Sequence, residues 1–229
     1  MLDKVKGRLI VSCQALENEP LHSPFIMGRM AKAAMEGGAV GIRAQGVEDI
    51  IEIKKVTGLP VIGIIKRNYE DSDIYITPTK KEVDELLTTG CEMIALDATN
   101  RVRPNNEDLK ELIKYIKENG VLVMADISNY DEAIKAQEYG VDCVSTTLSG
   151  YTPYTKTLEG PDFVLMERLV KDLEIPVIAE GKVNTPQDLK KVFELGVHSS
   201  VVGSAITRPQ LITCLLYTSD AADEEDSVD

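Results

Sequence analysis

The chain has 229 residues, 43% hydrophobic and 28% charged, which is enough for one sizeable globular domain with a full core. Its net charge of −13, without a basic cluster, argues against nucleic-acid binding. No apolar run approaches the roughly 20 residues that span a bilayer, and Met1–Ser12 lacks a signal-peptide pattern. We therefore expect a cytoplasmic protein with no nucleic-acid or membrane partner.

Eight segments predict strands. Apolar runs of this length, followed by helical patterns, are typical of parallel strands buried on both faces. In chain order, they lie within 10–13, 39–42, 60–65, 88–97, 121–125, 141–147, 176–179 and 197–206. Six helical patterns between them carry apolar residues at i, i+3 and i+4, at 47–56, 81–90, 107–120, 131–140, 163–173 and 185–196. Thr185-Pro186 is a typical helix start.

A repeated helix-to-strand junction sets the architecture. Gly38, Gly90, Gly140 and Gly196 each follow a helical pattern and precede an apolar run, at intervals of about 50 residues. Glycine at that point suits the left-handed cap that ends a helix. Eight strands alternating regularly with helices predict an α/β fold, a closed (β/α)8 TIM barrel rather than an open sheet.

The C-terminal segment has a different origin in our interpretation. Residues 214–224, CLLYTSDAADE, match the translation of a common transposase sequencing adapter. Such scars are excluded from fold reasoning. We therefore expect a catalytic barrel over residues 1–213, a non-native tail over residues 214–229, and a truncated last helix. The alternative is a natural acidic tail.

Five of the predicted strands run into a polar residue: Gln14, Arg43, Lys66, Asp126 and Glu180. Barrel enzymes carry their chemistry at the C-terminal strand ends. Burial and the neighbouring Arg43 would leave the Lys66 amine partly neutral and basic near pH 7. Lys66 could instead be a surface lysine, and the two carboxylates could be helix caps. Gln14 is a ligand contact or a loop anchor.

Two loops suit a phosphate group. One follows strand seven and contains Gly181 and Lys182, and the other follows strand eight and contains Gly203, Ser204 and Arg208. Glycines let the backbone approach closely, and exposed amides attract an anion. This pair of loops often binds phosphate in TIM barrels. The sequence therefore predicts a phosphorylated sugar as the ligand.

Several absences narrow the chemistry. His22 lies in a loop and His198 begins strand eight, at the opposite end of the barrel from the strand ends. Cys13, Cys91 and Cys143 lie in or near strands without metal-like spacing, so we expect buried thiols. We expect no metal site. No GxGxxG motif indicates a nicotinamide cofactor.

At these residues the chain resembles the bacterial N-acetylmannosamine-6-phosphate 2-epimerase family of amino-sugar and sialic acid salvage. The resemblance covers essentially residues 1–213. It is carried by LIVSCQALENEPLHSP, GGAVGIRAQG, PVIGIIKR, ALDATNR, MADIS, STTLSGYT, VIAEGKVNTP and VVGSAITRP. It implies a cofactor-independent TIM barrel, usually homodimeric through a C-terminal helix, that interconverts N-acetylmannosamine 6-phosphate and N-acetylglucosamine 6-phosphate.

The resemblance also implies roles. The catalytic lysine falls on Lys66, the supporting arginine and carboxylates on Arg43, Asp126 and Glu180, and the substrate-contacting glutamine on Gln14. We hypothesise that Lys66 removes the proton at carbon 2 of the open-chain aldehyde and can return it to the opposite face, and that Arg43 stabilises the enolate.

Glu180 would move protons during ring opening, and Asp126 would orient the lysine or a hydroxyl; these two roles could be exchanged. The alternatives are an aldolase in which Lys66 forms a Schiff base with a keto-sugar phosphate, and a phosphosugar-binding barrel without catalysis.

Overall fold

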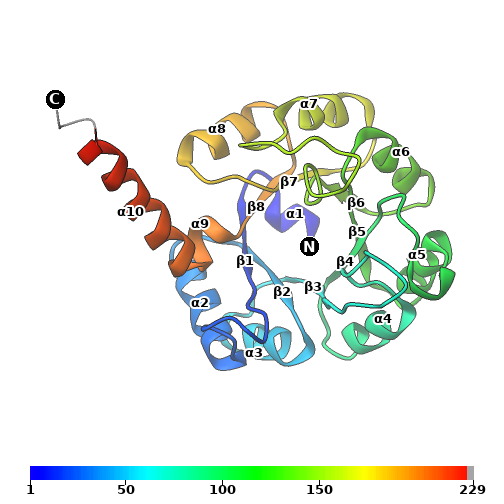
Figure 1. Cartoon of the computed structure of the whole chain (residues 1–229). Helices are drawn as coiled ribbons and strands as arrows, with labels where there is room; N and C mark the ends of the chain where they lie inside the picture. Colours follow the sequence, from blue (N-terminus) through cyan, green and yellow to red (C-terminus); the bar gives the residue numbers. More distant parts are fainter. Residues whose placement is uncertain (226–229) are drawn as a thin grey trace.

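Eight parallel strands close into a barrel in the order of the sequence, with each strand paired to the next and β8 paired to β1. The computed structural model describes residues 1–225. The strands are β1 (Leu9–Cys13), β2 (Gly41–Gln45), β3 (Val61–Ile64), β4 (Met93–Asp97), β5 (Leu122–Asp126), β6 (Cys143–Ser145), β7 (Val177–Glu180) and β8 (Ser199–Val202). The predicted TIM barrel is confirmed (Figure 1).

Most of the helices surround the barrel, whereas the first lies across its centre in this view and the last projects outwards (Figure 1). They are α1 (Leu2–Val5), α2 (Pro24–Glu36), α3 (Val47–Thr57), α4 (Lys80–Leu87), α5 (Leu109–Glu118), α6 (Tyr130–Glu138), α7 (Phe163–Asp172), α8 (Pro186–Glu194), α9 (Ser204–Thr207) and α10 (Pro209–Glu225), with a 3₁₀ turn at Pro104–Asn106. The four junction glycines all have positive φ, as predicted. Thr185 caps α8 and accepts a hydrogen bond from the Asp188 amide.

The barrel interior changes character along its axis. Near the N-terminal ends of the strands it is apolar, filled by a cluster that includes Ile10, Ile62, Met93, Met124 and Ile178. A second apolar layer joins the outer faces of the strands to the helices. Because strand side chains alternate between the two faces, the next inward positions towards the C-terminal ends carry the polar groups of the site.

The bounds of several strands differ from the sequence prediction, and two of these differences concern site residues. Arg43 does not end β2 but lies in its middle, since the strand begins at Gly41 and runs to Gln45. The guanidinium has buried partners inside the barrel, so the charge does not interrupt the strand. β3 ends at Ile64, and Lys66 follows in an antiparallel bridge with Ile76. Lys66 therefore keeps the inward parity of Ile62 and Ile64 while lying beyond the strand.

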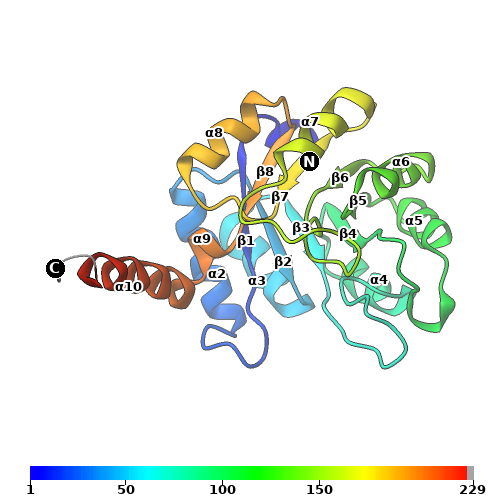
Figure 2. The same cartoon turned by 45° about the horizontal axis from the view of Figure 1, so that its top comes forward.

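The chain after β8 leaves the barrel. The short helix α9 contacts β1, and α10 contacts α9 and projects away from the other helices (Figures 1 and 2). α10 runs without a break through Cys214, where we predicted the native sequence to end. Residues 226–229 of the predicted tail lie outside the described residues. Within residues 1–225, the structure contains no helix that combines the length and apolarity needed to cross a membrane.

Candidate active site

A cavity of about 750 Å³ opens at the C-terminal ends of the strands, a volume in the range of small-molecule sites. Gln14, Arg43, Lys66 and Glu180 all line it. So do the residues of the two predicted phosphate loops: Gly181, Lys182, Gly203, Ser204 and Arg208. Asp126 does not line the cavity but is fully buried behind Arg43. The structure thus brings the sequence-predicted residues together.

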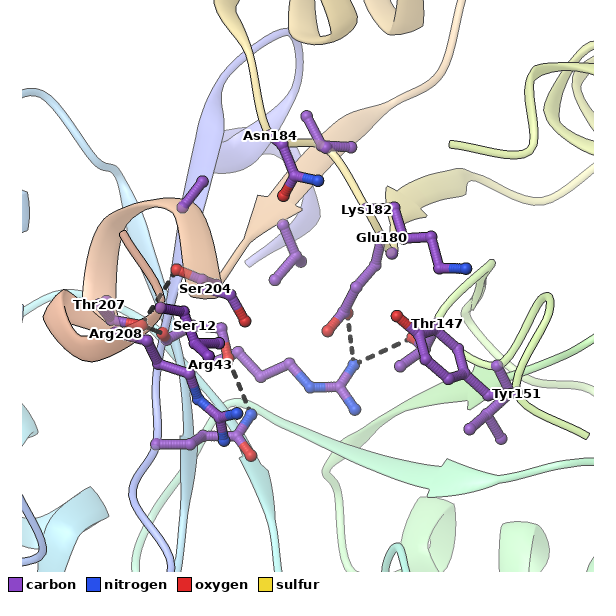
Figure 3. Close-up of a pocket in the computed structure, with 18 of the residues that line it drawn as sticks. Ser12, Arg43, Thr147, Tyr151, Glu180, Lys182, Asn184, Ser204, Thr207 and Arg208 are labelled. Carbon is purple, nitrogen blue, oxygen red and sulfur yellow. Dashed lines mark hydrogen bonds and ion pairs between the residues drawn. The ribbon is translucent and has the colours of Figure 1, made fainter. Parts of the chain in front are cut away.

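Arg43 is a cation held inside the barrel, with its side chain 1% exposed. Its guanidinium forms a bidentate pair with Asp126, with Nη1 2.9 Å from Oδ1 and Nη2 2.5 Å from Oδ2. Nη1 also donates to Glu180 Oε2 at 2.7 Å (Figure 3). Burial alone would lower the pKa of Arg43, but Asp126 and Glu180 outweigh it and raise the pKa. One guanidinium therefore fixes both carboxylates.

Glu180 is anchored through a single oxygen. Oε2 accepts from Arg43 and lies 3.4 Å from the Ser145 hydroxyl. Among the described residues, none donates a hydrogen bond to the other oxygen, Oε1, and the side chain is 14% exposed in the cavity. Burial raises the pKa of Glu180, against the opposing effect of the Arg43 cation. The carboxyl group is thus suited to exchange a proton with a ligand.

Lys66 faces the same cavity, and among the side chains of residues 1–217 none forms an ion pair with its ammonium group. Burial, followed by the nearby cations Arg43 and Arg208, lowers the pKa of Lys66 to about 8. The direction predicted from the sequence is confirmed. A lysine with this pKa exchanges protons near neutral pH.

Gln14 follows β1 with its amide oriented by Ser12. Nε2 donates to the Ser12 hydroxyl at 2.8 Å, whereas the buried Oε1 has no partner among the described residues. An unpaired buried amide oxygen is costly, so this atom is available to accept from a ligand hydroxyl or amide.

The two glycine-containing loops differ in how their cations are engaged. Arg208 Nη2 lies 3.2 Å from Glu19 Oε1, and the arginine side chain remains part-exposed. Gly203 and Ser204 are at the start of the short helix α9, and Arg208 directly follows it. The Lys182 ammonium instead donates to the Leu158 carbonyl and lies 5.0 Å from the centroid of the Tyr151 ring. Lys182 thereby joins the β7–α8 loop to the β6–α7 loop.

Comparisons with known proteins identify the family. A family model described as "Putative N-acetylmannosamine-6-phosphate epimerase" matches residues 27–220. The chain belongs to this family. A Clostridium perfringens (strain SM101) protein named "Putative N-acetylmannosamine-6-phosphate 2-epimerase" is 68% identical over 213 residues, covering 93% of this chain and 96% of that protein. A similarly named protein of Caldanaerobacter subterraneus is 54% identical over 215 residues, covering 93% and 91%.

Solved structures agree with this assignment. The N-acetylmannosamine-6-phosphate 2-epimerase from Clostridium perfringens superposes with a TM-score of 0.94 at 66% identity, covering 95% of each chain. A thiamine phosphate pyrophosphorylase from Pyrococcus furiosus gives a TM-score of 0.61 at 18% identity, covering 90% of this chain and 89% of that one. The second likeness concerns the fold alone.

Sequence reasoning missed several residues that line the cavity of this epimerase-family chain. They are Ser12, Tyr75, Thr147 and Tyr151, whereas Asn184 and Thr207 lie within the two predicted phosphate loops. For Ser12 and Thr147 a signal was present, because side chains two residues apart point to the same face of a strand. Ser12 lies two residues after the inward-facing Ile10, and Thr147 lies two residues after Ser145. Nothing in the spacing of Tyr75 pointed to the site, since it lies in the loop between β3 and α4.

Breaking the buried ion pair tests this geometry. We expect Asp126→Ala to lower the free energy of unfolding by about 3–5 kcal/mol, because it removes the bidentate partner of the buried Arg43 guanidinium and leaves Glu180 as its one carboxylate among the described residues. Urea denaturation measures the loss. In the matched control Lys190→Ala, which removes the exposed pair with Glu194 on α8, the change stays below about 1 kcal/mol. Equal losses in the two variants would contradict the buried network.

Proposed function

We propose that this protein interconverts N-acetylmannosamine 6-phosphate and N-acetylglucosamine 6-phosphate by epimerisation at carbon 2, without a cofactor. Membership of the family supports the substrate. The observation that carries the chemistry is that Lys66 and Glu180 line one cavity from nearly opposite sides of the barrel. They follow or end β3 and β7, which stand four strands apart in a closed ring of eight.

The substrate determines what the site has to do. Carbon 2 carries a hydrogen and the acetamido group. In the closed ring this hydrogen is not acidic, whereas in the open-chain aldehyde it lies next to a carbonyl and its removal gives an enolate. Epimerisation requires a proton to leave one face of carbon 2 and another to arrive at the opposite face.

The sequence hypothesis gave both proton transfers to Lys66. Two proton-transfer groups on opposite sides satisfy the same requirement without turning the enolate over, and we propose this arrangement instead. In one direction the neutral Lys66 amine removes the proton and protonated Glu180 supplies one from the other face. In the reverse direction ionised Glu180 is the base and the Lys66 ammonium is the acid. The unpaired Oε1 of Glu180 is the oxygen that exchanges the proton, because Oε2 is held by Arg43.

Arg43 and Asp126 support the transfer indirectly. The Arg43 cation stabilises negative charge that develops on the enolate, an electrostatic effect that is large in a buried site. The Asp126 carboxylate accepts hydrogen bonds from Nη1 and Nη2 of Arg43. These two bonds fix the orientation in which the guanidinium contacts Glu180. We therefore assign Asp126 to orienting Arg43 rather than the lysine.

The phosphate is assigned to the loops after β7 and β8. Arg208, Gly203 and Ser204 supply a cation and backbone amides beside the cavity, with Gly181 on the facing loop. Lys182 lines the same space, although its ammonium is engaged with the β6–α7 loop. Gln14 is assigned to a sugar hydroxyl or the acetamido group, because its amide oxygen lacks a partner among the described residues.

We further propose that residues 1–213 form the catalytic unit and that residues 214–229 are not part of it. All eight strands and every residue of the proposed mechanism lie before Cys214. The family model extends to residue 220 and Leu215 borders the cavity, but no residue of the proposed mechanism lies beyond Arg208.

Loss of the amine tests the assignment of Lys66. We expect Lys66→Ala to reduce incorporation of solvent deuterium at carbon 2 by about 10²–10⁴-fold, the usual contribution of a general base, while binding of the phosphosugar persists. Proton NMR in heavy water measures the exchange, and Lys190→Ala is the matched control. Wild-type exchange in Lys66→Ala would remove the lysine from the mechanism, and borohydride trapping of substrate on Lys66 would favour the aldolase.

The pH dependence tests whether the two groups share one proton. Both directions of the reaction start with a single proton distributed between Lys66 and Glu180, so activity follows that state. We expect a bell-shaped profile of kcat/KM. Activity falls above about pH 8, where Lys66 loses its proton and both groups are deprotonated. It also falls below the raised pKa of Glu180, where both are protonated.

The alkaline limb is the diagnostic part of this profile, because the phosphate of the substrate titrates near pH 6. If Lys66 acted alone as the base, activity would rise through about pH 8 to a plateau. Such a plateau would contradict the two-group mechanism and leave the epimerase activity itself unaffected.

A further inference from the structure

The seam between β3 and β4 opens towards the C-terminal end of the barrel. The last residues that pair across it are Gly63 and Ile94, although β4 runs further. If the same register continued, the Ile65 amide would donate to the Ala95 carbonyl. Instead, part of the β3–α4 loop lies between the two chains.

Residues 75–77, here called the inserted segment, replace β4 as the neighbour of the chain beyond β3. On one side Lys66 forms an antiparallel bridge with Ile76, and the Thr77 amide donates to the carbonyl of the residue before Lys66 at 2.8 Å. On the other side the Asp97 amide of β4 donates to the Ile76 carbonyl at 3.1 Å. At this seam, Lys66 is therefore held by the inserted segment and not by the barrel sheet.

The hydroxyl of Thr77 makes the hydrogen bonds that the opened seam leaves unmade. Oγ1 donates to the Ala95 carbonyl at 2.7 Å and accepts from the Ile65 amide at 3.4 Å. These are the two backbone groups that would pair directly if β3 and β4 continued. Both residues are buried, and backbone groups left unpaired there would be costly. One side-chain hydroxyl thus stands in the ladder of the sheet.

The backbone of Thr77 is strained. Its φ is 44°, in the left-handed region that glycine adopts freely and that a β-branched residue rarely does. The residue is fully buried. Arg103, also buried, holds the turn: its Nη1 donates to the Pro78 carbonyl at 2.9 Å and lies 3.4 Å from the Thr77 carbonyl oxygen. Glycine would avoid the strain but would supply no hydroxyl, so the bridge is the physical reason for a threonine here.

We propose that Thr77 is a positioning residue for Lys66, with a hydroxyl that locks the inserted segment between β3 and β4 and thereby fixes the direction of the lysine in the cavity. This inference rests on the part of the proposed function in which Lys66 exchanges the proton at carbon 2. Proton transfer from carbon needs a close and directed approach of the amine, and a displacement of about 1 Å can cost roughly 10²-fold in rate.

The inserted segment acts on Lys66 through position alone. It carries no group that is charged near neutral pH, since burial raises the pKa of its tyrosine. The charged groups that act on the ammonium belong to other elements: Arg43, Arg208, Glu180 and Glu19. Burial has the largest effect and lowers the pKa of Lys66 to about 8. If the inserted segment loosens, water reaches the amine and the pKa rises towards the ordinary value of a lysine.

Removal of the hydroxyl with the shape of the side chain preserved tests the proposal. In Thr77→Val, the pH midpoint for acetylation of Lys66 by acetic anhydride, followed by mass spectrometry of its peptide, should rise by about 1 pH unit from the wild-type value. We expect kcat to fall about 10–10²-fold and KM for N-acetylmannosamine 6-phosphate to stay unchanged, since the phosphate loops lie across the barrel. Thr77→Ser keeps the hydroxyl and should restore the midpoint and kcat.

Thr89 offers a matched control at the opposite end of the barrel. It is a buried threonine whose hydroxyl also donates to a backbone carbonyl, that of Leu86 at 2.7 Å, and accepts from a backbone amide, that of Cys91 at 3.2 Å. Thr89→Val therefore removes an equivalent pair of bonds without touching the inserted segment. The Lys66 midpoint and kcat should stay at their wild-type values in this variant.

A wild-type Lys66 midpoint and kcat in folded Thr77→Val, or equal changes in Thr89→Val, would overturn the proposal. If Thr77→Val does not fold, Thr77→Gly takes its place, because it removes the hydroxyl and the strain together and should show the same rise of the midpoint. The labelling needs no turnover. Absence of deuterium exchange at carbon 2 in the wild type would refute the proposed function, whereas an unmoved Lys66 midpoint would refute the role of Thr77.

Discussion

A single buried guanidinium organises the site. Arg43 lies inside the barrel at the level where the interior changes from apolar to polar, and it binds Asp126 and Glu180 at once. A lone charge at this depth would be prohibitively costly, so the cation and the two carboxylates depend on one another. This constraint fixes the direction of Glu180, leaves its Oε1 towards the cavity, and contributes to the lowered pKa of Lys66.

The arrangement also explains how one barrel holds an acid and a base in the same cavity. Lys66 has no anionic partner within the described residues. Burial and the nearby cations lower its pKa, so its neutral form is accessible. Glu180 is buried beside a second carboxylate, so its protonated form is accessible. Groups whose environments move their pKa values towards each other can trade one proton across a substrate.

Much of this could be predicted from the sequence, because the signals were local. Buried parallel strands are apolar runs, and capping glycines mark the helix ends. The eight strand–helix units, and the polar residues Gln14, Lys66 and Glu180 that follow or end strands, could therefore be predicted. The position of Arg43 was not. A cation inside a strand looks like the end of the strand unless its partners are known, and those partners come from β5 and β7, far away in sequence.

The same reason hid the hydroxyl residues and the course of the last helix. Ser145 and Thr147 lie within the predicted strand over residues 141–147, but their inward direction matters only once β6 is seen to face Asp126 and Glu180. α10 continues as a helix past Cys214. Its failure to cover the barrel is a tertiary property that no local pattern records.

The account depends on proton transfer from two sides, and early-time NMR of the wild type in heavy water tests it most directly. Starting from N-acetylmannosamine 6-phosphate, the account predicts that the first N-acetylglucosamine 6-phosphate formed carries deuterium at carbon 2 while the remaining substrate keeps hydrogen. Early product that retains hydrogen at carbon 2, or substrate that gains deuterium before product appears, would contradict it, because either result requires a single group to serve both faces.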